Sequence, residues 1–168
     1  MNKSKDYTFF VLFLWIGLFA IVAAIAYLSF QGGEAAKALG TDLIGGAASR
    51  YYGTKELTET QYNAMAYVIR QSGRIIAFFV MGVWCSITIH ATFHRLNWVI
   101  RTIIIVLFLL VVAVLTERLK IYIPTRHYSK EEMMLSIYGA LGGAAIVSIV
   151  TFVYSLVKFL LGLFIKEK

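Results

Sequence analysis

The sequence predicts an all-α integral membrane protein with four transmembrane helices. The chain has 168 residues, of which 60% are hydrophobic, and its mean hydropathy is +0.75. A soluble globular chain is about 45–50% apolar, and one membrane span needs about 20 consecutive apolar residues. Four runs reach that length, and the polar remainder is too short for a separate soluble domain. We therefore expect residues 1–168 to form a single membrane domain.

The first span is predicted at about residues 8–30, where Thr8 to Phe30 is almost unbroken apolar sequence. The apolar core of a signal peptide is shorter, about 7–15 residues. Because Ala24-Ile25-Ala26 resembles a cleavage site, a removable leader remains an alternative to the retained helix that we favour.

Residues 31–66 form the longest polar region and are predicted to be an outer loop, with a possible short surface helix over 35–44. Near the end of this region, Thr58 and Gln61 have capping-box spacing, in which each side chain satisfies a free amide at a helix start. A helix is therefore expected to begin near Glu59 and to continue into the second span, at about 68–92.

The third and fourth spans are predicted at about 98–115 and 133–157. Four spans place both termini on the same side of the membrane. The short basic segments favour the cytoplasmic side for both termini. The formal net charge is +7, but the lysines and arginines lie beside the apolar runs, where they anchor helix ends to anionic headgroups. No soluble basic face with interleaved aromatic residues is evident, so nucleic-acid binding is not predicted.

Several charged residues are expected at one membrane face, because the second span starts, the third ends and the fourth starts there. The candidate ligand-binding residues at this face are Arg70, Arg74, Glu117, Arg126, Glu132 and Ser136. Arginine forks bind phosphate or carboxylate through two parallel hydrogen bonds. An anionic lipid or lipid-linked headgroup is therefore one predicted ligand.

Two other interpretations of this cluster stay open. Its charges could be structural, for example an Arg70–Glu117 ion pair between helices. They could also be catalytic, since two carboxylates can share acid and base roles; Ser129 and Ser136 are then candidate nucleophiles, but the sequence pairs neither with a base.

The histidines, the cysteine and the paired glycines of the apolar runs lead to further predictions. His90 and His94 are four residues apart, but no carboxylate accompanies them, so neither a metal site nor any cofactor is predicted. Cys85, inside an apolar run, is expected to be a packing residue. Gly139 and Gly143 lie one helical turn apart and predict close contact with another helix, within the chain or on another subunit.

Five short motifs, taken in order, resemble the VanZ family. They are Tyr27-Leu28-Ser29-Phe30-Gln31 with Glu34, Val68-Ile69-Arg70-Gln71, Thr116-Glu117, Ile123-Pro124-Thr125-Arg126, and the series Ser129, Glu132, Ser136, Gly139, Gly143. The resemblance covers Tyr27 to Gly143. This chain departs from the family pattern at Thr116 and Glu132, where members usually have aspartate, at Gln71 and Arg74, where they have lysine and histidine, and at Lys120, where they have glutamine.

The resemblance implies a small bacterial plasma-membrane protein associated with low-level resistance to teicoplanin-type glycopeptides. Combined with the charged cluster, it suggests binding of an anionic lipid or a lipid-linked cell-wall precursor at the outer face. The alternatives are a membrane enzyme acting on a lipid phosphate or wall intermediate, and a structural partner of another membrane protein. Neither the oligomeric state nor any catalytic activity follows from the sequence.

Overall fold

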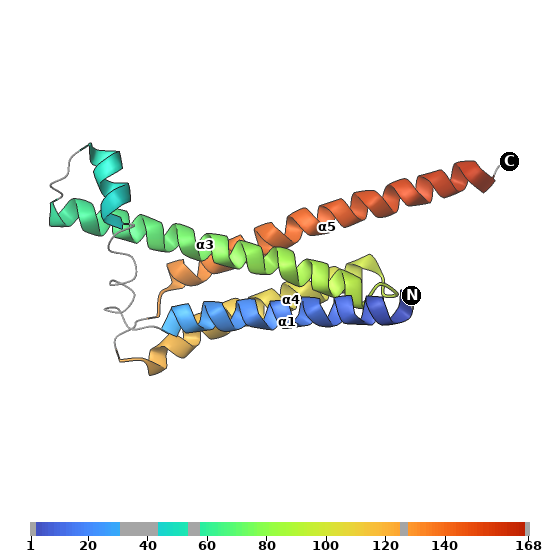
Figure 1. Ribbon diagram of the computed structural model, residues 1–168, viewed down its shortest axis with the longest axis horizontal. Coiled ribbons are helices and arrows are strands. Elements are labelled where there is room, and N and C mark those ends of the chain that lie inside the picture. The colour runs from blue at the N-terminus through green and yellow to red at the C-terminus, as the bar shows by residue number, and fades with distance from the viewer. Residues whose placement is uncertain (1–2, 31–43, 54–57, 125–127, 167–168) are drawn as a thin grey trace.

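The computed structural model describes residues 3–30, 44–53, 58–124 and 128–166, and nearly all of them are helical. The main elements are α1 (Lys3–Phe30), α3 (Glu59–Thr92), α4 (Trp98–Arg118), the short 3₁₀ helix η1 (Leu119–Tyr122) and α5 (Lys130–Lys166) (Figure 1). Four of these helices are long and apolar enough to cross a membrane. The predicted all-α fold with four membrane-spanning helices is confirmed.

The helices extend beyond the predicted spans. The apolar run sets the length that crosses the hydrocarbon, but a helix continues until its backbone hydrogen bonds are interrupted. For this reason the region predicted as an outer loop includes the first turns of α3, and it also contains helical residues 44–52. Most of the helix expected over 35–44 lies outside the described residues.

The predicted start of α3 is confirmed by its capping box. The backbone N–H of Gln61 donates to Thr58 Oγ1 at 3.4 Å, and the backbone N–H of Thr58 donates to Gln61 Oε1 at 3.1 Å. Two amides that the helix cannot satisfy internally are thus paired, and α3 begins at Glu59.

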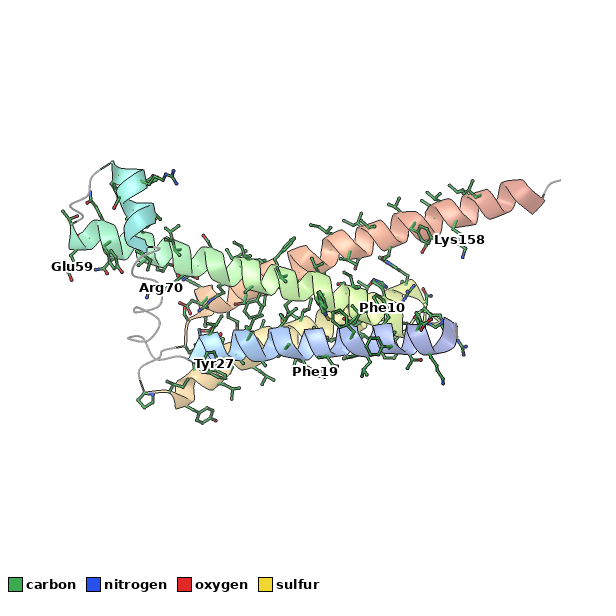
Figure 2. All side chains as sticks on the ribbon, viewed as in Figure 1. Phe10, Phe19, Tyr27, Glu59, Arg70 and Lys158 are labelled. Atoms are coloured by element: carbon green, nitrogen blue, oxygen red, sulfur yellow. The ribbon has the colours of Figure 1, made fainter. Side chains whose placement is uncertain are left out.

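The core lies between the four long helices. Its buried members include Leu18 and Ile25 of α1, Phe78, Met81, Cys85 and Ile89 of α3, Ile105 and Leu109 of α4, and Ala140 and Ala144 of α5. Cys85 is fully buried, as expected of a packing residue. Many large apolar side chains instead lie on the outside, among them Phe10 and Phe19 of α1 (Figure 2). An apolar exterior of this extent is typical of a surface covered by lipid.

Helices α3 and α5 pack with their backbones in close contact. A β-carbon added at Gly139 would lie 2.6 Å from the carbonyl oxygen of Ile75, and one added at Gly143 would overlap the carbonyl of Phe79. On the opposite side of the contact, Gly82 faces the carbonyl of Ala140 in the same way. The predicted close packing of Gly139 and Gly143 is therefore confirmed, and the partner helix belongs to the same chain.

Helix α1 is attached to α3 by two tryptophans. The indole N–H of Trp84 donates to the Leu14 carbonyl at 2.9 Å, and that of Trp15 donates to Thr92 Oγ1 at 3.0 Å. Leu18 is fully buried in the shared core. These contacts pack α1 against α3 as one helix of the bundle.

The bundle has two ends that differ in their charged residues. We call the end where α1 and α4 finish and α5 begins the Arg74 end, and the end where α3 finishes and α4 begins the Arg101 end. Helix α5 continues past the Arg101 end, and its outer part, which carries Lys158, diverges from the other helices (Figures 1 and 2).

Candidate functional site

A buried lysine lies between two carboxylates at the Arg74 end. Lys120 in η1 is 1% exposed, and its Nζ is 2.6 Å from Glu117 Oε2 and 3.0 Å from Glu132 Oε2. Glu117, in the last turn of α4, is 3% exposed. The tight 3₁₀ turn that follows α4 places residues three apart on the same side, so Lys120 folds back onto Glu117.

Arg74 of α3 completes the network. Its Nη2 is 2.6 Å from Glu132 Oε2, and its Nη1 is 3.4 Å from Glu117 Oε2. Each carboxylate thus contacts both cations, and the four formal charges sum to zero. Buried charges are tolerated only when they are paired and hydrogen-bonded, so this network connects α3, α4, η1 and α5 as one unit.

The two serines considered as nucleophiles support this network. The backbone N–H of Ser129 donates to Glu117 Oε1 at 3.2 Å, and Ser129 Oγ accepts from the backbone N–H of Glu132 at 3.4 Å. Ser136 Oγ donates to the Glu132 carbonyl at 3.0 Å and is buried. Both side chains therefore satisfy or orient backbone groups at the start of α5.

A cavity of about 230 Å³ lies beside the network, between the end of α1 and α3. Its lining comprises Ile25, Leu28 and Ser29 of α1 and Arg70, Gly73, Arg74, Ala77 and Phe78 of α3. The wall is mostly apolar, and the two arginines supply its charge. Gly73 leaves it open, since a β-carbon there would meet nothing within 4 Å.

Arg70 differs from Arg74 in its contacts. Its Nε donates to the Ala66 carbonyl one turn earlier at 3.0 Å, and the residue is exposed. Among the described residues, the arginine that contacts Glu117 is Arg74, so the Arg70–Glu117 ion pair considered from the sequence is wrong. Arg70 lines the cavity near the end of α1 that carries Tyr27 (Figure 2), and its terminal nitrogens contact no described carboxylate.

The structure brings three of the predicted site residues into contact: Arg74, Glu117 and Glu132. Arg70 lies beside them on the cavity, Ser136 contacts Glu132 through the backbone, and Arg126 falls outside the described residues. Sequence reasoning missed Lys120 as a site residue. Its spacing of three from Glu117 was the available signal, because residues three apart on a helix are neighbours.

His90 and His94, the two histidines with a spacing of four, lie at the Arg101 end. His94 packs edge-on against Tyr7, with ring centroids 6.0 Å apart, whereas His90 is buried with its Nε2 3.5 Å from Thr151 Oγ1. Within the described residues, no three histidine, cysteine or acidic side chains group closely enough to hold a metal ion.

Comparison with known proteins adds no relative to this description. No family model, curated protein or solved structure matches the chain. The VanZ resemblance therefore remains an expectation from the motifs.

Proposed function

We propose that the cavity at the Arg74 end binds an amphiphile with an anionic headgroup. Arg70 would hold the phosphate, and the apolar wall formed by Ile25, Leu28 and Phe78 would cover the first part of the lipid chain. The observation that carries this proposal is the combination, in one cavity, of an apolar wall and an arginine whose terminal nitrogens contact no described carboxylate.

The neighbouring network supports this role through its neutrality. Because Lys120 and Arg74 compensate Glu117 and Glu132, the carboxylates do not repel an anion that approaches Arg70. Hydrogen bonds from guanidinium to phosphate are charge-assisted and about twice as strong as neutral ones. The headgroup of the ligand would therefore contact the guanidinium of Arg70, beside a network that carries no net charge.

The cavity volume limits what part of the ligand is enclosed. Pockets that bury a drug-sized molecule measure about 300–1,000 Å³. At about 230 Å³ this cavity holds a headgroup and the adjoining chain, and the rest of an amphiphile would remain in the bilayer. If the VanZ resemblance holds, the expected ligand is a lipid-linked wall precursor, and binding would alter glycopeptide susceptibility.

The contacts favour binding over catalysis. A general base needs a carboxylate that can exchange a proton with the substrate. Here Glu117 and Glu132 are each engaged with two cations, and Ser129 and Ser136 are engaged with backbone groups. The membrane-enzyme alternative has no matching observation, whereas a structural role for the network is compatible with binding beside it.

Closing the cavity is the sharpest test. Gly73→Leu would fill the space that the glycine leaves, and leucine is favoured over glycine in a helix, so folding should be retained. Binding of short-chain phosphatidylglycerol and of a polyprenyl diphosphate, measured by native mass spectrometry, should be lost. Gly46→Leu is the matched control, because Gly46 also meets nothing within 4 Å but does not line the cavity. A folded Gly73→Leu protein with unchanged lipid binding would contradict the proposal.

Arg70→Gln tests the headgroup contact separately. Loss of a charged hydrogen bond costs about 1.5–3 kcal/mol, which corresponds to a roughly ten- to hundredfold loss of affinity. Arg50→Gln, at an exposed arginine outside the cavity lining, should leave the affinity unchanged. Equal losses in both variants would indicate general electrostatic attraction to anionic lipid and would exclude a specific site.

The wall-precursor version of the proposal also depends on orientation. Reporter fusions at Gly53 and Lys168 should give opposite signals, with Gly53 outside, if the short basic segments set the topology. A cytoplasmic signal at Gly53 would leave lipid binding possible at that face but would exclude an outer-leaflet wall precursor.

A further inference from the structure

Polar side chains from three helices form a second layer at the Arg101 end. His90 of α3 contacts Thr151 of α5, with 3.5 Å between Nε2 and Oγ1, and the ring of Trp98 of α4 lies 5.3 Å from that of Phe152. Arg101 follows Trp98 by three residues in α4, so the two lie on neighbouring positions of one helix face. Residues from α3, α4 and α5 are thus brought to one place.

Three atoms of this layer are buried but lack hydrogen-bond partners among the described residues. They are His90 Nδ1, Trp98 Nε1 and Arg101 Nε, and His90 as a whole is only 9% exposed. Buried polar atoms in proteins are nearly always paired, so three together call for an explanation. The other two of the chain's three tryptophans have paired indole N–H groups, on Thr92 and Leu14.

The charge at this end is also uncompensated. Arg101 is half-buried, and no ion pair of the described residues includes it. Its end of the bundle carries the further cations Lys5 and Arg95, whereas its described carboxylate is that of Asp6, which is exposed on α1. A half-buried arginine without a carboxylate favours an anionic ligand.

The donors and acceptors of the layer restrict the chemical class of the ligand further. Arg101 Nε and Trp98 Nε1 can only donate. The Thr151 hydroxyl donates to the Ser148 carbonyl at 3.0 Å, so its oxygen accepts from His90 Nε2, and Nδ1 of the neutral ring is then an acceptor. Two donors, one acceptor and one positive charge complement an anion that also carries a hydroxyl group.

We propose that His90, Trp98 and Arg101 form a second binding site, for an anionic phosphate group that carries a hydroxyl. The phosphate oxygens accept from Arg101 and Trp98, and the hydroxyl donates to His90. Arg101 lies about one turn inside the start of α4, at the beginning of this candidate membrane span. Both a glycerol phosphate headgroup and free hydrogen phosphate have this chemistry. The site shares no residue with the cavity at the Arg74 end, so it does not depend on the function proposed above.

This site is tested directly by the NMR signals of the tryptophan indole N–H groups, recorded on the protein in a neutral detergent. The ¹⁵N-labelled Gly73→Leu protein, whose other cavity is filled, is titrated with inorganic phosphate, short-chain phosphatidylglycerol or short-chain phosphatidylcholine. The Trp98 signal, assigned through Trp98→Phe, should shift with phosphate, phosphatidylglycerol or both, while the signals of Trp15 and Trp84 stay in place. Phosphatidylcholine, which is zwitterionic and lacks the hydroxyl, should have no effect.

The pattern of response identifies the source of the ligand. A shift with inorganic phosphate shows that a free anion suffices, and a shift with phosphatidylglycerol alone identifies a lipid headgroup. Arg101→Gln should weaken the response at least tenfold, whereas Arg95→Gln, at an exposed arginine of the same end, should not change it. An unmoved Trp98 signal, an equal response to phosphatidylcholine, or a response that survives Arg101→Gln would overturn the proposal.

Discussion

The two ends of the bundle differ in the partners of a half-buried arginine. At one end, Arg74 lies within 3.4 Å of Glu117 and 2.6 Å of Glu132, and Lys120 completes a neutral network. At the other, Arg101 takes part in no described ion pair and lies near two further unpartnered polar atoms. Both arginines belong to long apolar helices and are half-buried, so residue type and burial alone do not distinguish them.

The difference shows that the partners of a charge indicate its role. A paired arginine has its hydrogen bonds committed to the fold, and removing it leaves buried carboxylates without compensation. An unpaired arginine stabilises little by itself but keeps its capacity for a ligand. Arg70 combines the two situations, because it lies beside the neutral network but contributes none of the network's ion pairs.

The largest expected effect comes from Lys120→Met, which removes the central cation of the Arg74 end. Breaking a buried pair by deleting one partner costs about 3–5 kcal/mol, because the remaining charge is left uncompensated. Thermal unfolding in a neutral detergent should show a loss of this size. Lys130→Met, at an exposed lysine nearby, should stay near wild type. If the two variants are equally stable, the network does not hold the helices together.

A matched pair of arginine variants compares the two ends directly. Arg74→Gln should cost about 1.5–3 kcal/mol of unfolding free energy, less than the lysine variant because Arg74 is 18% exposed and water can partly compensate. Arg101→Gln, measured in the same lipid-free detergent, should be neutral or slightly stabilising, since no described carboxylate loses its partner. Equal destabilisation by the two substitutions would remove the distinction between the ends.

Much of the Arg74 end could be predicted from the sequence, because it follows from topology. Once four apolar runs are assigned as spans, the start of the second, the end of the third and the start of the fourth must share a face. That requirement alone places Glu117, Glu132 and Arg74 near one another. The sequence likewise showed that Gly139 and Gly143 share a helix face, since their spacing is one turn.

What could not be predicted depends on how the helices pack or continue. Lys120 lies just beyond the predicted third span, and the 3₁₀ turn after α4 directs it inward. The glycine spacing marks a face but not the helix that covers it, so α3 was not identified as the partner. The unpartnered atoms of Trp98 and Arg101 arise from the arrangement of three helices, and no local pattern distinguishes Trp98 from Trp84.

Gly143→Ala probes the contact that connects the two ends through α3 and α5. A β-carbon there overlaps the Phe79 carbonyl, which cannot move without shifting a helix, so a loss of about 1–3 kcal/mol is expected. Gly142→Ala is the matched control, because its β-carbon would make an ordinary 3.8 Å contact with a Phe79 side-chain atom. Alanine is favoured over glycine in helices by the same amount at both sites, so the difference reports the packing. Equal melting temperatures would contradict the close contact.

The smallest expected difference is in stability between Trp84→Phe and Trp98→Phe. The two variants are comparable because the same atoms are removed from each. Trp84→Phe loses a hydrogen bond to the Leu14 carbonyl, whereas Trp98→Phe removes an N–H that has no partner in the described structure. Both changes also lose a similar apolar volume, so in neutral detergent Trp84→Phe should be less stable by only about 1 kcal/mol, the net value of one hydrogen bond. With phosphatidylglycerol present, the gap should narrow or reverse, because a ligand that binds only the folded protein adds stability that Trp98→Phe cannot recover. A lipid-independent gap would mean that Trp98 contributes nothing to ligand binding, and the Arg101 end would then differ from the Arg74 end only in having an unpaired charge.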